Sequence, residues 1–307
     1  MADDVMSGGN VWVAAARPRT LMLALATVGM GVFLAWSRGE GRPLIALLCI
    51  LTAMGLQILS NFANDYGDTL HGADSATRVG PRRAVQSGVI TAVQMRQAMV
   101  VAGVISAVLG VSLVILALGT EALGALILFA LLGAGAIWAA VAYTASDKPY
   151  GYVGLGDLFV FIFFGWVAVL GTYYLQALHL DWTLMLPATS CGLFSVAVLN
   201  VNNIRDIESD KVAGKRSIPV RIGVERARQY HWGLLIIGFL AAFLYVLLHY
   251  NSPVQFLFVL TAPLLYKHGM AVWRGRTAKE LDPLLKQMSI TTFLFVLTFG
   301  VGIVVGG

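Results

Sequence analysis

The sequence predicts an all-α integral membrane protein, a single domain over residues 1–307 with about nine transmembrane helices around a central cavity open to the cytoplasmic side. Hydrophobic residues make up 58% of the chain, charged residues only 12%, and the mean hydropathy is +0.78. A soluble domain carries roughly 25% charged residues. The long apolar stretches favour helices, since only helices and closed barrels satisfy their backbone groups in lipid.

Nine apolar stretches reach or approach the ~17–25 residues that a spanning helix requires. In chain order they cover about 18–36, 43–63, 98–118, 122–143, 158–178, 182–201, 232–250, 254–273 and 288–305. The eighth has the weakest signal, because its continuous apolar run stops near Tyr266. The segment Met1–Asn10 lacks the basic residues of a signal peptide, so the first span is expected to be retained.

The distribution of Lys and Arg predicts the orientation. With the N-terminus in the cytoplasm, all but two of the 21 Lys and Arg residues fall on the cytoplasmic side, and only Arg38 and Arg42 fall outside. Cytoplasmic loops of membrane proteins carry this excess of positive charge. The formal net charge of +5 therefore belongs to the loops, and with no nucleic-acid-binding motif in the sequence we expect no nucleic-acid partner.

Two polar strings with the same spacing interrupt the apolar pattern, each at the end of a span that runs inward. Residues three or four apart share one face of a helix, so each string predicts a polar stripe. The stripe positions are Gln57, Asn61, Asn64 and Asp68 in the first string, and Asn202, Asp206 and Asp210 in the second. Carboxylates at a membrane boundary are costly to desolvate and usually have a partner there. Both stripes are expected at the same depth.

The residue types of the two strings favour a magnesium site that holds a polyanion. Oxygen ligands suit Mg²⁺, which keeps water and bridges one or two carboxylates to substrate phosphates. The predicted metal ligands are Asn64, Asp65, Asp68, Asn202, Asp206 and Asp210, with Asp68 and Asp206 as the catalytic pair. The predicted diphosphate-binding cations are Arg78, Arg82, Arg83, Lys148, Lys211 and Lys215. These parts would stabilise a diphosphate as a leaving group.

A cation-coupled transporter is the alternative from another functional class. Transport sites tend to lie near the bilayer midplane on interrupted helices, whereas these acidic residues end their helices at one face. The two cysteines, Cys49 and Cys191, lie singly inside apolar spans and are expected to pack as small hydrophobic side chains.

Several motifs spread over nearly the whole chain resemble one known family. They are Arg17-Pro18, Tyr143-Thr144 and the stretches 59–68, 72–74, 78–82, 86–88, 149–152, 154–157 and 200–206. With these motifs the chain resembles the UbiA superfamily of intramembrane aromatic prenyltransferases, and more narrowly the bacterial 1,4-dihydroxy-2-naphthoate polyprenyltransferases of menaquinone synthesis. The family's first acidic motif falls on Asn64 and Asp68, and its second falls on Asp206 and Asp210. Its Tyr-x-x-x-Lys element does not fit cleanly, because Tyr143 and Lys148 are five apart.

The resemblance implies a Mg²⁺-dependent enzyme of the bacterial cytoplasmic membrane. It would transfer a polyprenyl group from polyprenyl diphosphate to 1,4-dihydroxy-2-naphthoate, with loss of CO₂, to give demethylmenaquinone; a sister enzyme that uses 4-hydroxybenzoate or another aromatic acceptor stays open. The residues expected at the aromatic substrate are Arg17, Asn61, Tyr143 and Asp157. A membrane anchor is the alternative for Arg17, and a helix cap is the alternative for Asp157. No obligate protein partner is inferred.

Overall fold

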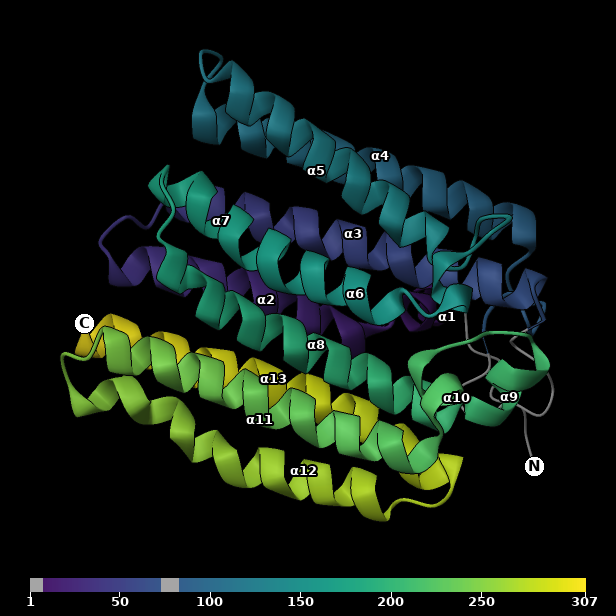
Figure 1. Ribbon diagram of the computed structural model, residues 1–307. Coiled ribbons are helices and arrows are strands. Elements are labelled where there is room, and N and C mark those ends of the chain that lie inside the picture. The colour runs from purple at the N-terminus through teal and green to yellow at the C-terminus, as the bar shows by residue number, and fades with distance from the viewer. Residues whose placement is uncertain (1–7, 73–82) are drawn as a thin grey trace.

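The computed structural model describes residues 8–72 and 83–307, and every regular element within these ranges is a helix. Nine helical segments of this part are long and apolar enough to cross a membrane, which confirms the predicted all-α class and the predicted number of spans. Figure 1 shows them as one elongated bundle. Two of the predicted diphosphate-binding cations, Arg78 and Arg82, lie outside the described residues.

The spans follow one another in antiparallel order, with short helices at one end of the bundle. The spanning elements are α2 (Pro18–Ser37), α3 (Pro43–Leu70), α4 (Ala92–Leu118), α5 (Leu123–Ala142), α6 (Gly156–Val160) with η2 (Phe161–Val167) and α7 (Ala168–Ala177), η3 (Trp182–Leu184) with α8 (Met185–Arg205), α11 (Val224–Leu248), η4 (Pro253–Thr261) with α12 (Ala262–Arg274), and α13 (Ala278–Gly306). The short helices are α1 (Gly8–Ala16), η1 (Tyr150–Val153), α9 (Ile207–Val212) and α10 (Ile218–Ile222).

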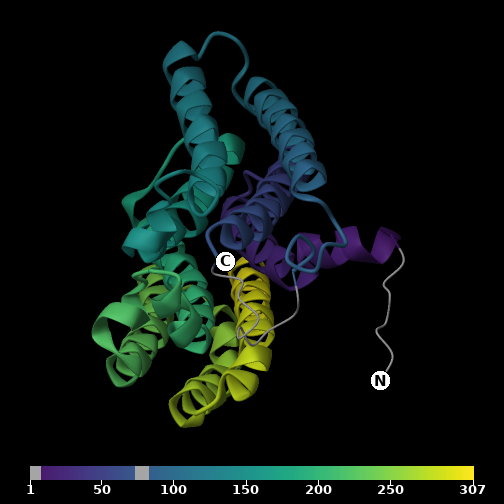
Figure 2. The same ribbon diagram turned by 90° about the vertical axis from the view of Figure 1, so that its right-hand side faces the viewer.

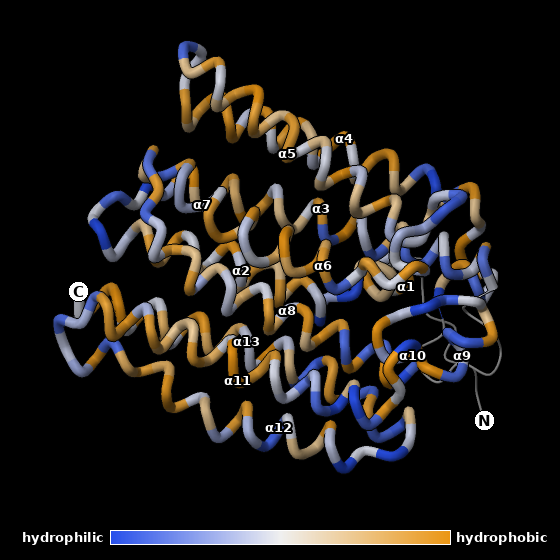
Figure 3. The backbone as a smooth tube through the Cα atoms, in the orientation of Figure 1, coloured by the Kyte–Doolittle hydropathy of each residue, from blue (hydrophilic) through white to orange (hydrophobic). Residues whose placement is uncertain are grey.

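The two ends of the bundle differ in polarity. We call the end that carries both acidic strings the motif end; it comprises residues 8–17, 66–72, 83–91, 143–155, 206–223 and 275–277. The first helix, α1, lies at this end and the C-terminus lies at the other (Figure 1). Figure 3 shows hydrophilic residues gathered around α1, α9 and α10, next to the largely hydrophobic middle of the bundle.

Two spans extend well past their predicted boundaries at the motif end. The helix α3 continues beyond position 63 to Leu70, and α13 begins at Ala278 rather than near 288. Thr277 caps α13 by accepting a hydrogen bond from the backbone N–H of Glu280. Hydropathy marks where a helix leaves lipid, not where its backbone hydrogen bonds end, so the polar ends were missed.

Two other spans are irregular. The fifth contains the π-helical segment η2, and the eighth opens with the 3₁₀ segment η4. Where η2 crosses α8, a Cβ on Gly165 would lie 2.8 Å from the carbonyl oxygen of Ala188. Only glycine permits this close approach, which brings the fifth and sixth spans together.

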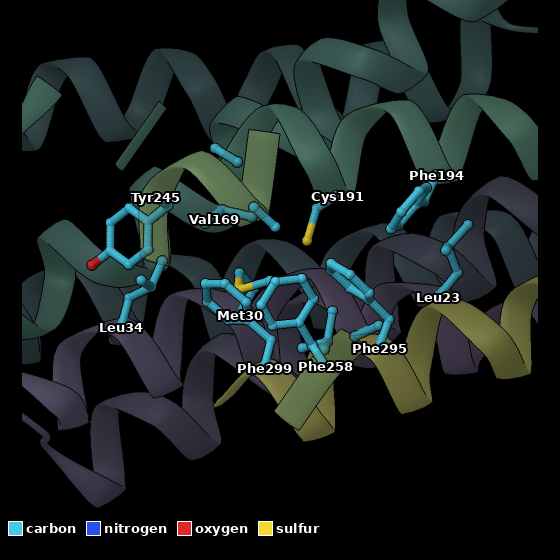
Figure 4. Packing of buried hydrophobic residues seen from close by; sticks show 14 of the residues in the cluster. Leu23, Met30, Leu34, Val169, Cys191, Phe194, Tyr245, Phe258, Phe295 and Phe299 are labelled. Carbon is cyan, nitrogen blue, oxygen red and sulfur yellow. The ribbon is translucent and has the colours of Figure 1, made fainter. Parts of the chain in front are cut away.

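Aromatic side chains fill the middle of the bundle between α2, α8, α11, η4 and α13 (Figure 4). The rings of Phe194 and Phe295 meet edge to face with centroids 4.9 Å apart, and Phe258 lies 5.4 Å from Phe295. Such T-shaped pairs are favoured by the ring quadrupoles. Cys191 is a free, fully buried thiol within this cluster, and Cys49 is also buried and free, so both pack as expected.

The helices α4 and α5 form the most exposed part of the bundle. Figure 2 shows them on one side, with α11, α12 and α13 on the other. Much of the surface of α4 and α5 is apolar, including Val101, Val108 and Leu131. An apolar exposed surface of this kind suits contact with lipid tails. By contrast α8, which carries the second acidic string, is the most enclosed span.

Candidate active site

The first acidic string lies in the last two turns of α3. Asp68 is buried, and its carboxylate accepts a hydrogen bond from Arg83 at 2.8 Å and one from the Tyr152 hydroxyl at 3.1 Å. Arg83 also donates to the carbonyl oxygen of Asn64 at 2.7 Å. The Asn64 side chain oxygen lies 3.1 Å from the Thr144 hydroxyl. The first string is thus joined both to the segment after α3 and to the loop after α5.

Asp65 has a different environment from Asp68. Its two carboxylate oxygens accept hydrogen bonds from the backbone N–H groups of Ala84, at 3.0 Å, and Val85, at 3.1 Å. These bonds satisfy a turn that would otherwise bury two donors. Asp65, predicted as a metal ligand, therefore holds the segment that carries Arg83.

The second acidic string spans the junction of α8 and α9. Arg205 is buried and donates two hydrogen bonds to Asp206, at 2.7 and 2.6 Å, in the fork geometry typical of Arg–carboxylate pairs. It also donates to the side chain oxygen of Asn202 at 2.9 Å. Although α8 ends at Arg205, the Asp210 backbone N–H still bonds to the Asp206 carbonyl at 2.8 Å. The helical spacing therefore continues across the junction, and Asn202, Asp206 and Asp210 share one face, as predicted.

Lys215 lies between the two strings. Its ammonium is 3.5 Å from a carboxylate oxygen of Asp210 and 5.7 Å from the centre of the Tyr152 ring. Burial alone would lower the pKa of Lys215, but the negative charges of Asp68 and Asp210 outweigh burial and raise it above its ordinary value. Lys215 is therefore a fixed cation shared by both strings.

Tyr152 joins the same elements through three contacts. Its hydroxyl donates to Asp68, its ring lies beside Lys215, and its carbonyl oxygen accepts from the Arg216 backbone N–H at 2.8 Å. Gly151 allows this loop to fold tightly, since a Cβ there would lie 2.7 Å from the Tyr143 carbonyl oxygen. The loop after α5 thus brings the ends of α3 and α8 to one site.

Tyr143 lies within electrostatic range of both strings. Its pKa is raised to about 12, chiefly by burial; the charge of Lys215 opposes this rise, and those of Asp68, Asp157 and Asp210 add to it. Asp157, at the start of α6, accepts a hydrogen bond from the Tyr230 hydroxyl at 3.0 Å. Of the residues expected at an aromatic substrate, Tyr143 is thus within electrostatic range of both acidic strings, and Asp157 is within electrostatic range of Tyr143.

Arg17 forms the turn between α1 and α2 and has a left-handed backbone conformation, with φ 50° and ψ 73°. Asn61 supports this turn, donating to the Ala16 carbonyl oxygen at 2.7 Å and to the Thr20 hydroxyl at 2.9 Å. The Asn61 side chain oxygen in turn accepts from Gln57 at 3.2 Å. Asn61, predicted to contact substrate, is thus occupied in positioning Arg17. The positive charge of Arg17 acts on Asp68.

The predicted diphosphate-binding cations separate into two groups. Arg83 and Lys215 are buried among the acidic residues. Lys211 is half exposed and pairs with Glu208 at 3.0 Å, and Lys148 is exposed on its loop. The sequence interpretation assigned no site role to Arg205 or Tyr152. Arg205 could have been predicted from the sequence, because it directly precedes Asp206 and the carboxylates of the second stripe require a cationic partner.

The donor set fits Mg²⁺ with substrate phosphates as additional ligands. Among the described residues, no three carboxylates, imidazoles or thiols converge closely enough to hold a metal ion by themselves. The carboxylates of Asp68, Asp206 and Asp210 each lie beside a cation, and all their donors are hard oxygens. Mg²⁺ is seldom caged by protein alone and uses one or two carboxylates plus phosphate oxygens. The arrangement suits a metal that arrives together with a diphosphate.

Comparisons with known proteins identify the family of the chain. The UbiA prenyltransferase family matches residues 23–304, and the chain belongs to this family. It is 44% identical over 301 residues to the 1,4-dihydroxy-2-naphthoate octaprenyltransferase of Escherichia coli (strain K12), covering 97% of each chain. It is 38% identical over 288 residues to the protein of the same name from Mycobacterium tuberculosis (strain ATCC 25618 / H37Rv), covering 93% of this chain and 94% of that one.

Solved structures show the same fold at low sequence identity. A UbiA homolog from Aeropyrum pernix K1, in its apo form, superposes with a TM-score of 0.68 at 18% identity and covers 94% of this chain and 98% of its own. A UbiA homolog from Archaeoglobus fulgidus bound to DMAPP and Mg²⁺ gives a TM-score of 0.66 at 16% identity, covering 96% and 99%. The nine-span bundle is therefore the UbiA fold, and the chain is a multi-pass membrane prenyltransferase of that family.

Proposed function

We propose that this protein transfers a polyprenyl group from polyprenyl diphosphate to 1,4-dihydroxy-2-naphthoate, with Mg²⁺ and with loss of CO₂, to give demethylmenaquinone. The observation that carries the proposal is the position of Asp68, Asp206 and Asp210 at the same end of a membrane bundle, each beside a fixed cation. The naphthoate acceptor is supported by the names of the relatives that match over nearly the whole chain.

The diphosphate would bind between the two acidic strings. Asn64, Asp68, Asp206 and Asp210 would hold Mg²⁺ there, while Asp65 and Asn202 support the segments around them. Bound Mg²⁺ supplies Lewis-acid stabilisation of the negative charge on the leaving diphosphate. Lys215 and Arg83 would add fixed positive charge to the same oxygens, which is worth most in a buried site.

The aromatic acceptor would bind on the side of Tyr143 and Asp157, with Arg17 as the cation nearest its carboxylate. Ionisation of the prenyl donor gives an allylic cation that must meet an electron-rich ring and not water. The walls of the bundle exclude water and orient the ring, which lowers the entropic cost of the encounter. Attack through the ring carbon that bears the carboxylate forms the new C–C bond, and loss of CO₂ restores the aromatic ring.

The proposed substrates also indicate which side of the membrane the motif end faces. The motif end would face the cytoplasm of a bacterial inner membrane, where both diphosphate and aromatic acid are supplied. The prenyl tail would remain among the apolar spans and lipid. Loops that carry most of the Lys and Arg residues lie at this end, in agreement with the positive-inside rule.

The proposal is tested with purified protein, Mg²⁺, radiolabelled polyprenyl diphosphate and a panel of acceptors. We expect a labelled lipid product with 1,4-dihydroxy-2-naphthoate, release of labelled CO₂ from a carboxyl-labelled acceptor, and loss of both on chelation of the metal. Preferred use of 4-hydroxybenzoate would assign the chain to a sister activity. Absence of any labelled product with every acceptor would refute prenyl transfer.

A further inference from the structure

A chain of alternating charges connects the second acidic string to two other spans. Arg205 donates to Asp282 of α13 at 2.6 Å while it also holds Asp206 with its other two nitrogens. Arg19 of α2 lies 3.9 Å from the same oxygen of Asp282. The order is Arg19, Asp282, Arg205, Asp206. Neither Asp282 nor Arg19 belongs to either acidic string.

The geometry of Arg205 depends on Asp282. The Arg205 side chain is fully buried, and its three nitrogens donate to acceptors from two spans. Two of those acceptors, Asn202 and Asp206, are its near neighbours in sequence, whereas Asp282 is 77 positions away. An Arg fork anchored at one nitrogen keeps little freedom at the others. Asp282 therefore determines where the fork lies against Asp206.

Asp282 also determines how strongly Arg205 neutralises Asp206. The guanidinium charge of Arg205 is shared between two carboxylates, and Arg19 makes only a longer contact to Asp282, so Arg205 neutralises Asp206 only in part. Without the charge of Asp282, Arg205 would neutralise Asp206 alone, and an arriving metal cation would have to compete with an unshared Arg–carboxylate pair. A buried pair of this kind is strong, because the surrounding dielectric is low.

We propose that Asp282 is a positioning residue for the second acidic string: by sharing Arg205 it keeps Asp206 available to a divalent cation. This inference rests on the proposed function, since it concerns the same metal. The role is distinct from a structural tie between α8 and α13, which would affect stability but not the affinity for a metal ion.

The test compares Asp282→Asn with wild type. Asn keeps an acceptor for Arg205 and removes only the charge. We expect Mn²⁺ affinity, measured by electron paramagnetic resonance on the detergent-purified protein, to fall about 10–100-fold, the range usual for partners of metal ligands. The Mg²⁺ concentration that half-activates prenyl transfer should rise in parallel, and Asp282→Glu should restore most of both.

Two further variants test whether any loss of Mn²⁺ affinity comes from the shared Arg205 and not from a general loss of negative charge. Glu225→Gln removes one exposed negative charge from the same end of the bundle, at the start of α11, and should leave Mn²⁺ affinity unchanged. Arg205→Lys cannot bridge both carboxylates and should weaken Mn²⁺ binding as Asp282→Asn does. Wild-type affinity in a folded Asp282→Asn protein would overturn the inference. If wild type itself bound no Mn²⁺ and transferred no prenyl group, the proposed function would fail instead.

Discussion

Each carboxylate of the two acidic strings that is proposed to bind metal is already paired within the protein. Arg83 pairs with Asp68, Arg205 with Asp206, and Lys215 with Asp210. Removing one partner from a buried pair leaves an uncompensated charge and costs about 3–5 kcal/mol. Substitution by alanine would therefore mix loss of stability with loss of chemistry. Asparagine keeps the size of the side chain and an acceptor for the cation, so it disturbs the fold less than alanine does, and each variant is compared as folded protein.

The first prediction concerns the two central carboxylates. Asp68→Asn and Asp206→Asn should each lower the rate of prenyl transfer by ~10²–10³-fold or more, because each removes charge that holds the metal over the leaving group. The measurement is kcat with purified, folded protein at saturating Mg²⁺. Asp147→Asn is the matched control, since Asp147 is an exposed acid at the same end. Near wild-type turnover in either variant would remove that residue from the metal site.

The second prediction separates the roles of basic residues. Lys215→Met should reduce kcat by about 10²-fold or more, because a contact to the departing diphosphate strengthens as charge develops. Arg226→Ala should be nearly silent, since Arg226 is exposed at the start of α11. Steady-state kinetics over a range of polyprenyl diphosphate concentrations separate kcat from KM. Equal damage from both variants would mean that the diphosphate binds elsewhere at this end.

At the scale of elements, the site depends on how closely α3 approaches the loop after α5. A Cβ on Gly67 would lie 2.4 Å from the carbonyl carbon and oxygen of Thr144. That contact is backbone, so no side chain rotation relieves it. Gly67→Ala must push the end of α3 away from the loop and carry Asp68 away from Tyr152.

The third prediction follows from this contact. Gly67→Ala should destabilise the protein by about 1–3 kcal/mol, the usual cost of overpacking, and should also reduce turnover. Gly124→Ala, on α5, meets no heavy atom within 4 Å and should be neutral or slightly stabilising. Thermal unfolding in detergent and prenyl transfer are measured on both. A Gly67→Ala protein as stable and active as wild type would contradict the close approach.

The elements show what the sequence predicts well and what it misses. Hydropathy located all nine spans, because burial in lipid requires long apolar segments whatever the tertiary packing. It placed the end of α3 too early, because the residues from Asn64 to Leu70 are helical through backbone bonds that hydropathy does not report. The helix period correctly placed Asn64 and Asp68 on one face.

Side chain partners were the less predictable part of the site. Asp65 and Asp68 have the same side chain and adjacent contexts, yet Asp65 binds two backbone N–H groups and Asp68 binds Arg83. The difference depends on where residues 83–85 return to α3, which is a tertiary contact. The contact between Asp282 and Arg205 could not be predicted from the sequence for the same reason, since α13 meets α8 only in the folded bundle.

At the scale of the whole molecule, the arrangement of charge implies one orientation in the membrane. The first helix, α1, and both acidic strings lie at the motif end, and the C-terminus lies at the other (Figure 1). Arg38 and Arg42, the two cations predicted at the opposite end, both form hydrogen bonds there. Arg38 bonds to Asp181 at 3.2 Å, and Arg42 donates to the carbonyl oxygen of Ala117 at 3.0 Å. These two cations therefore serve local structure at the opposite end.

The fourth prediction tests this orientation directly. Cysteine is placed at Asp147, exposed at the motif end, or at Glu121, exposed in the loop between α4 and α5 at the opposite end. The native Cys49 and Cys191 are buried and should not react, so the wild-type background needs no change. A membrane-impermeant maleimide should label Glu121→Cys in spheroplasts, where only the outer face of the membrane is accessible. It should label Asp147→Cys only in inverted membrane vesicles. The reverse pattern would place the diphosphate site on the outer face and would contradict the orientation predicted by the positive-inside rule.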